Sequence, residues 1–161
     1  MYSVQFKLAD VSDAMAIVRL RQQIWSTTYR GIYPDTMIDD FDYYWHIEKE
    51  VSRIQRSDFA VYLIEIDHCL VGYLTMSNGV KAILQSLYIL AEYQGRGIGK
   101  AAIEYVKGYF RNAGRNEFIC HCHPENRNAR TFYEKMGGVV VCTDMDNEEH
   151  WQDSVTYQFL V

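Results

Sequence analysis

The spacing of the apolar residues changes several times along the chain. Residues 2–9 alternate polar and apolar side chains, which predicts a strand at the edge of a sheet. Between residues 14 and 25 the apolar positions recur at helical spacing, behind Asp10 or Ser12 as a cap. This helix is expected to end at residues 29–31, and a weaker helix, interrupted near residues 39–40, is expected at about residues 35–54.

The period shortens from residue 59 onward. Residues 59–66 and 70–76 predict a hairpin that turns at Asp67 and His68. The mostly apolar residues 82–90 are typical of a strand that is buried on both faces. Residues 98–112 and 126–136 return to helical spacing, and three further strands are expected at residues 118–122, 139–142 and 155–161.

The order of these segments is β-α-α-β-β-β-α-β-α-β-β, which predicts a mixed α/β fold of about seven strands flanked by about four helices. The chain has 161 residues, which suits a single domain over residues 1–161. It contains no internal repeat or low-complexity tract that would indicate a second domain.

Composition narrows the classes of partner. The net charge of −5 argues against a nucleic-acid-binding protein, which needs a basic face. No stretch approaches the roughly 20 apolar residues of a membrane span, and the start has no hydrophobic signal region, so a cytoplasmic location is expected. In the segment CHCH at residues 120–123 the cysteines and histidines point to opposite sides of a strand, and no metal is expected.

The segment YQGRGIGK, residues 93–100, is a candidate anion site. A strand, a glycine turn and a helix start together direct backbone N–H groups and the positive end of a helix dipole at one point. A Walker loop is excluded, because Ala101 follows Gly99-Lys100 and Gln94 stands where the first glycine is needed. The dinucleotide spacing Gly-x-Gly-x-x-Gly is also absent. Glycines that merely turn the chain are the alternative.

Two segments together resemble the GNAT superfamily of acyl-CoA-dependent N-acetyltransferases: LYILAEYQGRGIGKAAI at residues 87–103 and NRNARTFYEKMG at residues 126–137. WSTTYRGIYP at residues 25–34 is a looser match. The resemblance implies a mostly antiparallel sheet, acetyl-CoA as cosubstrate without a metal, and direct acetyl transfer in a ternary complex to the primary amine of a small molecule or peptide. A homodimer is also possible in this family. A non-catalytic acyl-CoA sensor is the alternative.

The resemblance also implies the cofactor contacts. Backbone amides would hold the pyrophosphate at Gln94, Gly95, Arg96, Gly97, Ile98, Gly99 and Lys100. The strand backbone at Leu87, Tyr88 and Ile89 would pair with the pantetheine arm, as an added strand does. Further cofactor contacts are expected from Asn126, Ala129 and Phe132.

Tyr133 is the candidate general acid. Asn126, Ala129 and Tyr133 are spaced i, i+3 and i+7, which places them on one face of one helix. A tyrosine hydroxyl, whose ordinary pKa is near 10, can protonate a departing CoA thiolate. A purely structural core tyrosine is the alternative.

The general base is less clearly marked. Many members of the family carry a glutamate on the fourth strand, where this chain has Ile83 with Gln85 nearby. Another branch uses a carboxylate five residues before the motif asparagine, and that position is His121, which titrates near neutral pH. Glu65, a water molecule, or a structural role for His121 are alternatives.

Acceptor contacts are expected from Tyr29, Tyr33 and Gln85, with Trp45 and Trp151 as further candidates. Acidic residues could form a cation-attracting rim or simply face solvent; they are Asp39, Asp40, Asp144, Asp146, Glu148 and Glu149. Gly138 stands where related proteins usually carry phenylalanine, and it is expected to loosen the packing there. The acceptor, the oligomeric state and the use of acyl groups other than acetyl stay open.

Overall fold

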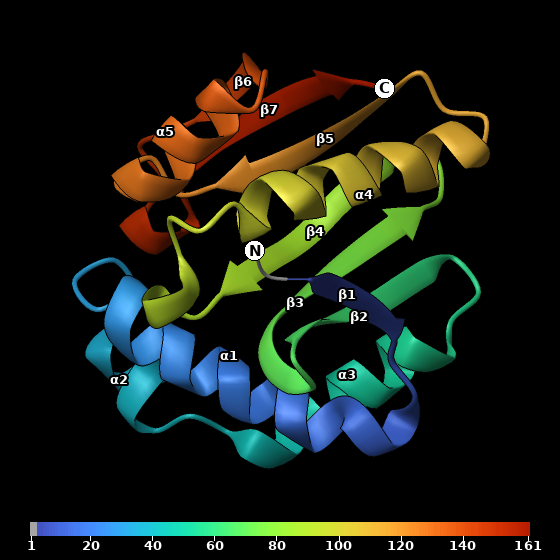
Figure 1. The fold of residues 1–161 in the computed structure, drawn as a ribbon. Coiled ribbons are helices and arrows are strands. Elements are labelled where there is room, and N and C mark those ends of the chain that lie inside the picture. The colour runs from blue at the N-terminus through green and yellow to red at the C-terminus, as the bar shows by residue number, and fades with distance from the viewer. Residues whose placement is uncertain (1–2) are drawn as a thin grey trace.

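One sheet of seven strands crosses the molecule in the order β1-β2-β3-β4-β5-β7-β6 (Figure 1). The computed structural model describes residues 3–161, so Tyr2 of the first predicted strand lies outside the described residues. The strands are β1 (Val4–Leu8), β2 (Phe59–Ile66), β3 (Cys69–Asn78), β4 (Ala82–Ile89), β5 (Glu117–Cys122), β6 (Val139–Asp144) and β7 (Ser154–Leu160). Neighbours are antiparallel except for β4 and β5, which confirms the mostly antiparallel mixed sheet.

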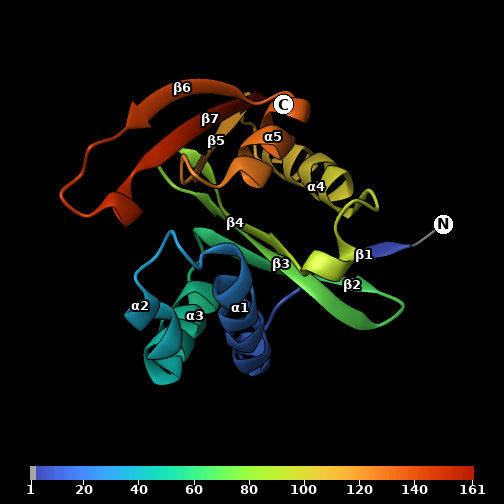
Figure 2. The same cartoon turned by 90° about the vertical axis from the view of Figure 1, so that its left-hand side faces the viewer.

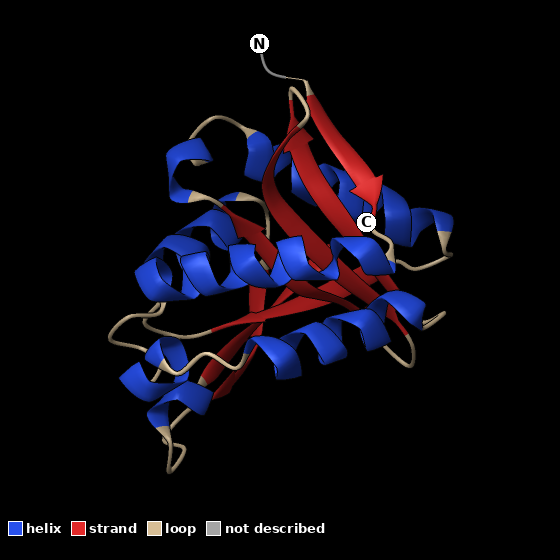
Figure 3. Cartoon of the chain, turned by 90° about the horizontal axis from the view of Figure 1, so that it is seen from below, coloured by secondary structure: helices blue, strands red, loops and turns tan. Residues whose placement is uncertain are grey.

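Helices cover both faces of the sheet (Figures 2 and 3). On one face lie α1 (Ala14–Thr28), α2 (Asp35–Asp39) and α3 (Tyr43–Gln55), and on the other lie α4 (Ile98–Asn112) and α5 (Arg127–Lys135). The break expected near residues 39–40 separates α2 from α3, so the described residues form five α-helices where about four were predicted. None of the helices in residues 3–161 is long and apolar enough to span a membrane.

The apolar stripe predicted for residues 98–112 becomes the buried face of α4. Its members Ile98, Ala102, Ile103, Val106 and Phe110 are each at most 1% exposed and pack against the sheet. Burial of each larger side chain, isoleucine, valine or phenylalanine, stabilises the fold by about 1.5–3 kcal/mol. On the opposite face, residues of α1 pack on β2 and β3 in a smaller cluster.

Strand β4 departs from the prediction that both of its faces are buried. Ala82 and Leu84 are 5% and 2% exposed and point into the α4 core, whereas Ile83 is half-buried and Gln85 is exposed on the other face. β4 pairs with β5 at two positions, Ile83 with Ile119 and Leu84 with Cys120. Beyond Leu84 the two strands separate, and this gap creates the space for a site.

Gly138 does not loosen the core, contrary to the prediction. A Cβ atom at Gly138 would lie 2.7 Å from Cζ of Phe159 and 2.9 Å from the carbonyl oxygen of Tyr133. Phe159 is 1% exposed and stacks on Phe118 with ring centroids 4.9 Å apart. The ring of Phe159 thus fills the space beside Gly138, and the glycine is required because nothing larger fits.

We expect Gly138→Ala to lower the free energy of unfolding by about 1–3 kcal/mol, because the methyl group overpacks a closed core. Gly108→Ala is the matched control: Gly108 lies inside α4 with open space around its Cα, so alanine should stabilise the helix by about 0.5–1 kcal/mol. Urea unfolding of the two variants measures both changes. Equal stability of the two variants would contradict the packing described here.

Candidate functional site

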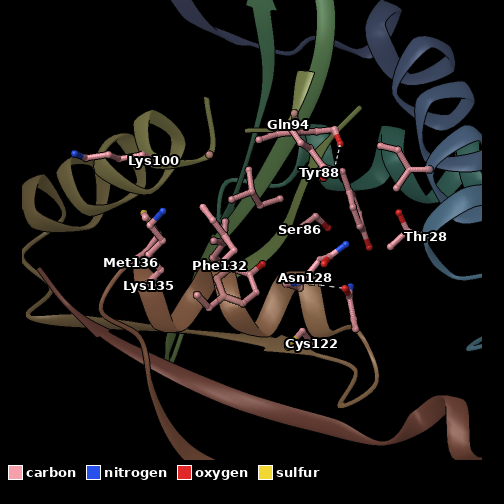
Figure 4. Close-up of a pocket in the computed structure, with 18 of the residues that line it drawn as sticks. Thr28, Ser86, Tyr88, Gln94, Lys100, Cys122, Asn128, Phe132, Lys135 and Met136 are labelled. Carbon is pink, nitrogen blue, oxygen red and sulfur yellow. Dashed lines mark hydrogen bonds between the residues drawn. The ribbon is translucent and has the colours of Figure 1, made fainter. Parts of the chain in front are cut away.

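A cavity of about 810 Å³ opens where β4 and β5 separate, with walls from α1, α4 and α5 (Figure 4). Most of the residues that the sequence singled out line it; these are Tyr29, Gln85, Leu87, Tyr88, Ile89, Gln94, Gly95, Gly97, Gly99, Lys100, His121, Asn126, Ala129, Phe132 and Tyr133. Arg96, Ile98 and Tyr33 are not among its lining residues. Three separate stretches of chain therefore meet around one space.

The glycine loop presents unpaired amides at the start of α4. Gly97 caps the helix with φ at +83°, and Gly95 has φ at +73°, both in the left-handed region that favours glycine. The first helical bond runs from the Ala101 amide to the Gly97 carbonyl, so the N–H groups of Ile98, Gly99 and Lys100 have no partner within the helix. An anion can bind at these donors.

Gln94 and Arg96 both contact neighbouring residues of the chain. The Gln94 amide donates to the carbonyl of Ala91 at 3.2 Å, and the Gln94 side chain donates to the carbonyl of Ile89 at 2.9 Å. Gln94 therefore cannot offer its amide to a ligand, and the set of donors predicted at residues 94–100 is reduced. The Arg96 guanidinium lies 5.3 Å from the centroid of the Tyr93 ring.

Gly99 and Ile98 have packing roles. A Cβ atom at Gly99 would lie 2.8 Å from Cε2 of Phe132, so the glycine lets α4 and α5 approach each other. The Ile98 side chain is 1% exposed and belongs to the core, so this residue can contribute to the cavity only through its backbone.

Asn126 begins helix α5, which forms the opposite wall. Its side-chain oxygen accepts from the Ala129 amide at 3.2 Å, so this motif asparagine is a helix cap. Three further residues that were not predicted also line this part of the cavity: Asn128, Lys135 and Met136 (Figure 4). The helical spacing could have found Met136, which lies four residues after Phe132.

Tyr133 lies on α5 and lines the cavity with a largely buried side chain. It is 7% exposed, and burial, with Cys120 and Cys122 nearby, raises the pKa of its hydroxyl well above the ordinary value. Tyr133 and Cys120 also share a side-chain hydrogen bond. Burial raises the pKa of the Cys122 thiol to about 11, so that thiol stays protonated at neutral pH. Both the hydroxyl of Tyr133 and the thiol of Cys122 therefore carry their protons at neutral pH.

Four polar side chains form a row across the neighbouring strands β3, β4, β5 and β7. Gln85 donates from Nε2 to Oγ of Ser77 at 2.9 Å. His121 lies opposite Thr156, and His121 Nδ1 is 2.7 Å from Thr156 Oγ1. Gln85 and His121 directly follow the last paired positions, Leu84 and Cys120, so they lie on either side of the point where the two strands separate.

The environment keeps His121 neutral. Partial burial and the positive charge of Lys81 lower the pKa of its imidazole below the ordinary value. The contact with Thr156 occupies Nδ1 and leaves Nε2 for a ligand in the cavity. Ser77 and Thr156 were not predicted, since nothing local in the sequence connects them to His121 or Gln85.

Aromatic side chains form the wall on the α1 side. Tyr29 is 8% exposed, lines the cavity and stacks on Tyr33 with centroids 4.4 Å apart. The ring of Tyr33 also contacts Trp151 edge-on, with centroids 6.0 Å apart. Tyr33 therefore packs against Tyr29 and connects the α1–α2 loop to the β6–β7 loop. Trp45 is not a lining residue, and neither is Glu65, the alternative base.

Within residues 3–161, no group of three or more His, Cys, Asp or Glu side chains is arranged to hold a metal ion.

Comparisons with known proteins all lead to acetyltransferases. A model of the acetyltransferase (GNAT) family matches residues 18–138. Spermidine N(1)-acetyltransferase of Thermoplasma acidophilum is 26% identical over 148 residues, which cover 88% of this chain and 92% of that protein. PaiA N-acetyltransferase of Thermoplasma acidophilum, solved with coenzyme A, superposes with a TM-score of 0.83 at 22% identity over 99% of both chains. Spermidine N-acetyltransferase of Vibrio cholerae, solved with CoA and spermine, gives a TM-score of 0.74 at 18% identity over 98% and 95%.

Proposed function

This chain belongs to the GNAT family of acetyltransferases, and we propose how its cavity transfers the acetyl group of acetyl-CoA to a primary amine. The observation that carries the proposal is the gap beyond Leu84, where β4 no longer pairs with β5. The gap lies between the glycine loop on one side and Tyr133 and His121 on the other, and all of them line one cavity.

Acetyl-CoA would enter along the free edge of β4. The amides of residues 98–100 bind its pyrophosphate, because N–H groups without a partner in the helix and the helix dipole favour negative charge there. Lys100 and Lys135, which also line the cavity, add positive charge. The backbone of residues 87–89 pairs with the amides of the pantetheine arm and so directs the thioester into the gap.

The reaction is a direct attack within a ternary complex. The amine nitrogen attacks the thioester carbonyl carbon, a new C–N bond forms, and the C–S bond breaks. His121 takes the proton that the amine loses, and Tyr133 gives its hydroxyl proton to the departing thiolate. Gln85, whose Nε2 is held by Ser77, can accept a hydrogen bond from the amine through Oε1.

Membership of the family supports catalysis over a non-catalytic sensor of acyl-CoA. Two further proposals concern the location of the protein and its assembly. A cytoplasmic location suits a chain whose four cysteines are free thiols. A homodimer suits the edge strand β6, in which all six residues are exposed.

The test is release of CoA from acetyl-CoA with a panel of alkylamines, polyamines, amino acids and peptides. We expect thiol release that depends on the amine, together with an acetylated product by mass spectrometry. Binding of CoA without turnover on any class of amine would support the sensor instead.

Gly97→Ala is expected to weaken CoA binding by about tenfold, because alanine disfavours the left-handed conformation and the loop amides turn away from the pyrophosphate. Gly108→Ala, in the middle of the same helix, is the control and should leave affinity unchanged. Calorimetric titration with CoA measures both dissociation constants. Equal affinity of the two variants would show that the loop is not the pyrophosphate site.

A further inference from the structure

A second cavity of about 390 Å³ lies next to the first on the open face of β4. Gln85 lines both cavities, so they meet at the residue that faces the acceptor amine. The bonding partner of Gln85, Ser77, also lines the second cavity. An acceptor whose amine binds beside Gln85 can therefore extend its other end into this space.

The second cavity is lined by both apolar and charged side chains. Ile83 and Phe59 offer apolar surface, and Arg56, Asp58 and Lys81 carry charge. Lys81 lies in the turn between β3 and β4, at the end of the cavity away from Gln85 along the strand. This lining suits an acceptor with an apolar spacer between its amine and a charged end.

The carboxylates that line the two cavities already have cationic partners. Asp58 accepts from Arg56 Nε at 2.9 Å and from Arg56 Nη2 at 2.6 Å. Glu104, on α4 in the first cavity, lies 3.7 Å from Lys107. The acidic residues predicted as a rim are exposed and line neither cavity. A second ammonium group on the acceptor would therefore find no unpaired carboxylate along these walls.

The second cavity offers a cationic side chain to the acceptor instead. Lys81 lines the second cavity, and no ion pair joins it to a carboxylate in the described part of the chain. Arg115 lies behind the same turn, where its guanidinium bonds neutral oxygens of Asn78, Gly79 and Val80 and so leaves its charge uncompensated. Glu117, on the neighbouring strand, is bonded to the neutral Gln158 and is not a lining residue of the second cavity. Lys81 and Arg115 both lie at the β3–β4 turn, so this end of the second cavity favours an anion.

We propose that the second cavity binds the distal part of the acceptor and that Lys81 pairs there with a carboxylate. The preferred acceptor is then an amino acid or another amine that carries a carboxylate at a distance, and not a polyamine. This inference rests on the proposed function, since it uses the same site for the attacking amine, and it adds the class of acceptor.

Three primary amines of equal chain length test the charge preference directly: aminovalerate, pentylamine and cadaverine end in a carboxylate, a methyl group and an ammonium group. We expect kcat/KM to fall in that order. Because Lys81 also lowers the pKa of His121, the rates are compared on the plateau of the pH profile, where His121 is deprotonated in both proteins. There Lys81→Gln should lower kcat/KM for aminovalerate by about tenfold, the loss expected for one charge-assisted contact, and change pentylamine by less than twofold. Lys81→Glu should reverse the order of aminovalerate and cadaverine. Lys7→Gln, on the distant edge strand β1, is the control and should behave as the wild type.

Two results would overturn the inference. One is a wild-type preference for cadaverine or spermidine; the other is an equal response of aminovalerate and pentylamine to Lys81→Gln. If the wild type acetylates none of these amines, the proposed acceptor chemistry fails separately. Calorimetric binding of aminovalerate to the CoA-saturated protein then still decides the subsite, since Lys81→Gln should weaken it about tenfold and equal binding would refute it.

Discussion

Replacing Tyr133 by phenylalanine is expected to lower kcat by a factor of about 100 to 1,000, the usual contribution of a positioned general acid. Tyr133 is buried, and burial raises the pKa of its hydroxyl, so the proton is present at neutral pH. Without this proton, the CoA thiolate has to leave as an anion beside a buried ring, which is unfavourable. The ring itself stays in place against Phe159 and Tyr157, so the dissociation constant for CoA should change by less than about twofold.

Tyr105→Phe is the matched control for this change. Tyr105 lies on α4 and stacks on Phe6 with centroids 4.4 Å apart, and it does not line the cavity. Loss of its hydroxyl should leave kcat within about twofold of the wild type. Steady-state kinetics and CoA titration on both variants decide the matter, and a Tyr133→Phe enzyme with unchanged kcat would remove the residue from the reaction.

His121→Gln should lower kcat/KM by about 100-fold and remove the acidic limb of its pH profile. A base works only in its deprotonated form, so the wild-type rate should rise with pH through the pKa of His121 and then level. Burial and Lys81 lower that pKa, which places the limb below the ordinary histidine range near 6.5. Glutamine keeps a polar side chain but cannot take the proton. A variant with the wild-type profile would exclude His121 as the base.

Thr156 separates this catalytic role from a structural one. Thr156→Val keeps the shape of the side chain but removes the oxygen that lies 2.7 Å from His121 Nδ1, so the limb should move and kcat should fall. Thr156→Ser restores an oxygen and should restore the profile. A threonine that serves only the sheet would instead change stability and leave the pH profile where it was.

Much of the site was visible in local patterns. The helix at residues 98–112 was predicted with the bounds that the structure has, because its apolar stripe and its glycine cap are both encoded within a few turns. The placement of Asn126, Ala129 and Tyr133 on one helix face follows from the same period, and all three reach the cavity. These predictions were possible because the helical period fixes which residues, close together in the sequence, share one face of a helix.

Other features depended on residues far apart in the sequence. The row of Ser77 with Gln85 and His121 with Thr156 needs the register of four strands, and a shift of one residue would turn each side chain to the other face. Gly138 was misjudged because the ring that fills its space belongs to Phe159 on β7. The sequence alone could not show that the Gln94 amide is already bonded to Ala91.

The sequence by itself determined the family, the glycine loop and the place of Tyr133 on the cavity face of its helix, because those depend on short-range spacing in one helix or one turn. The tertiary structure alone decided the neighbours of His121 and the second cavity with its available lysine. The physical reason is that strand register and the separation of β4 from β5 result from the packing of the whole sheet, which no single segment encodes.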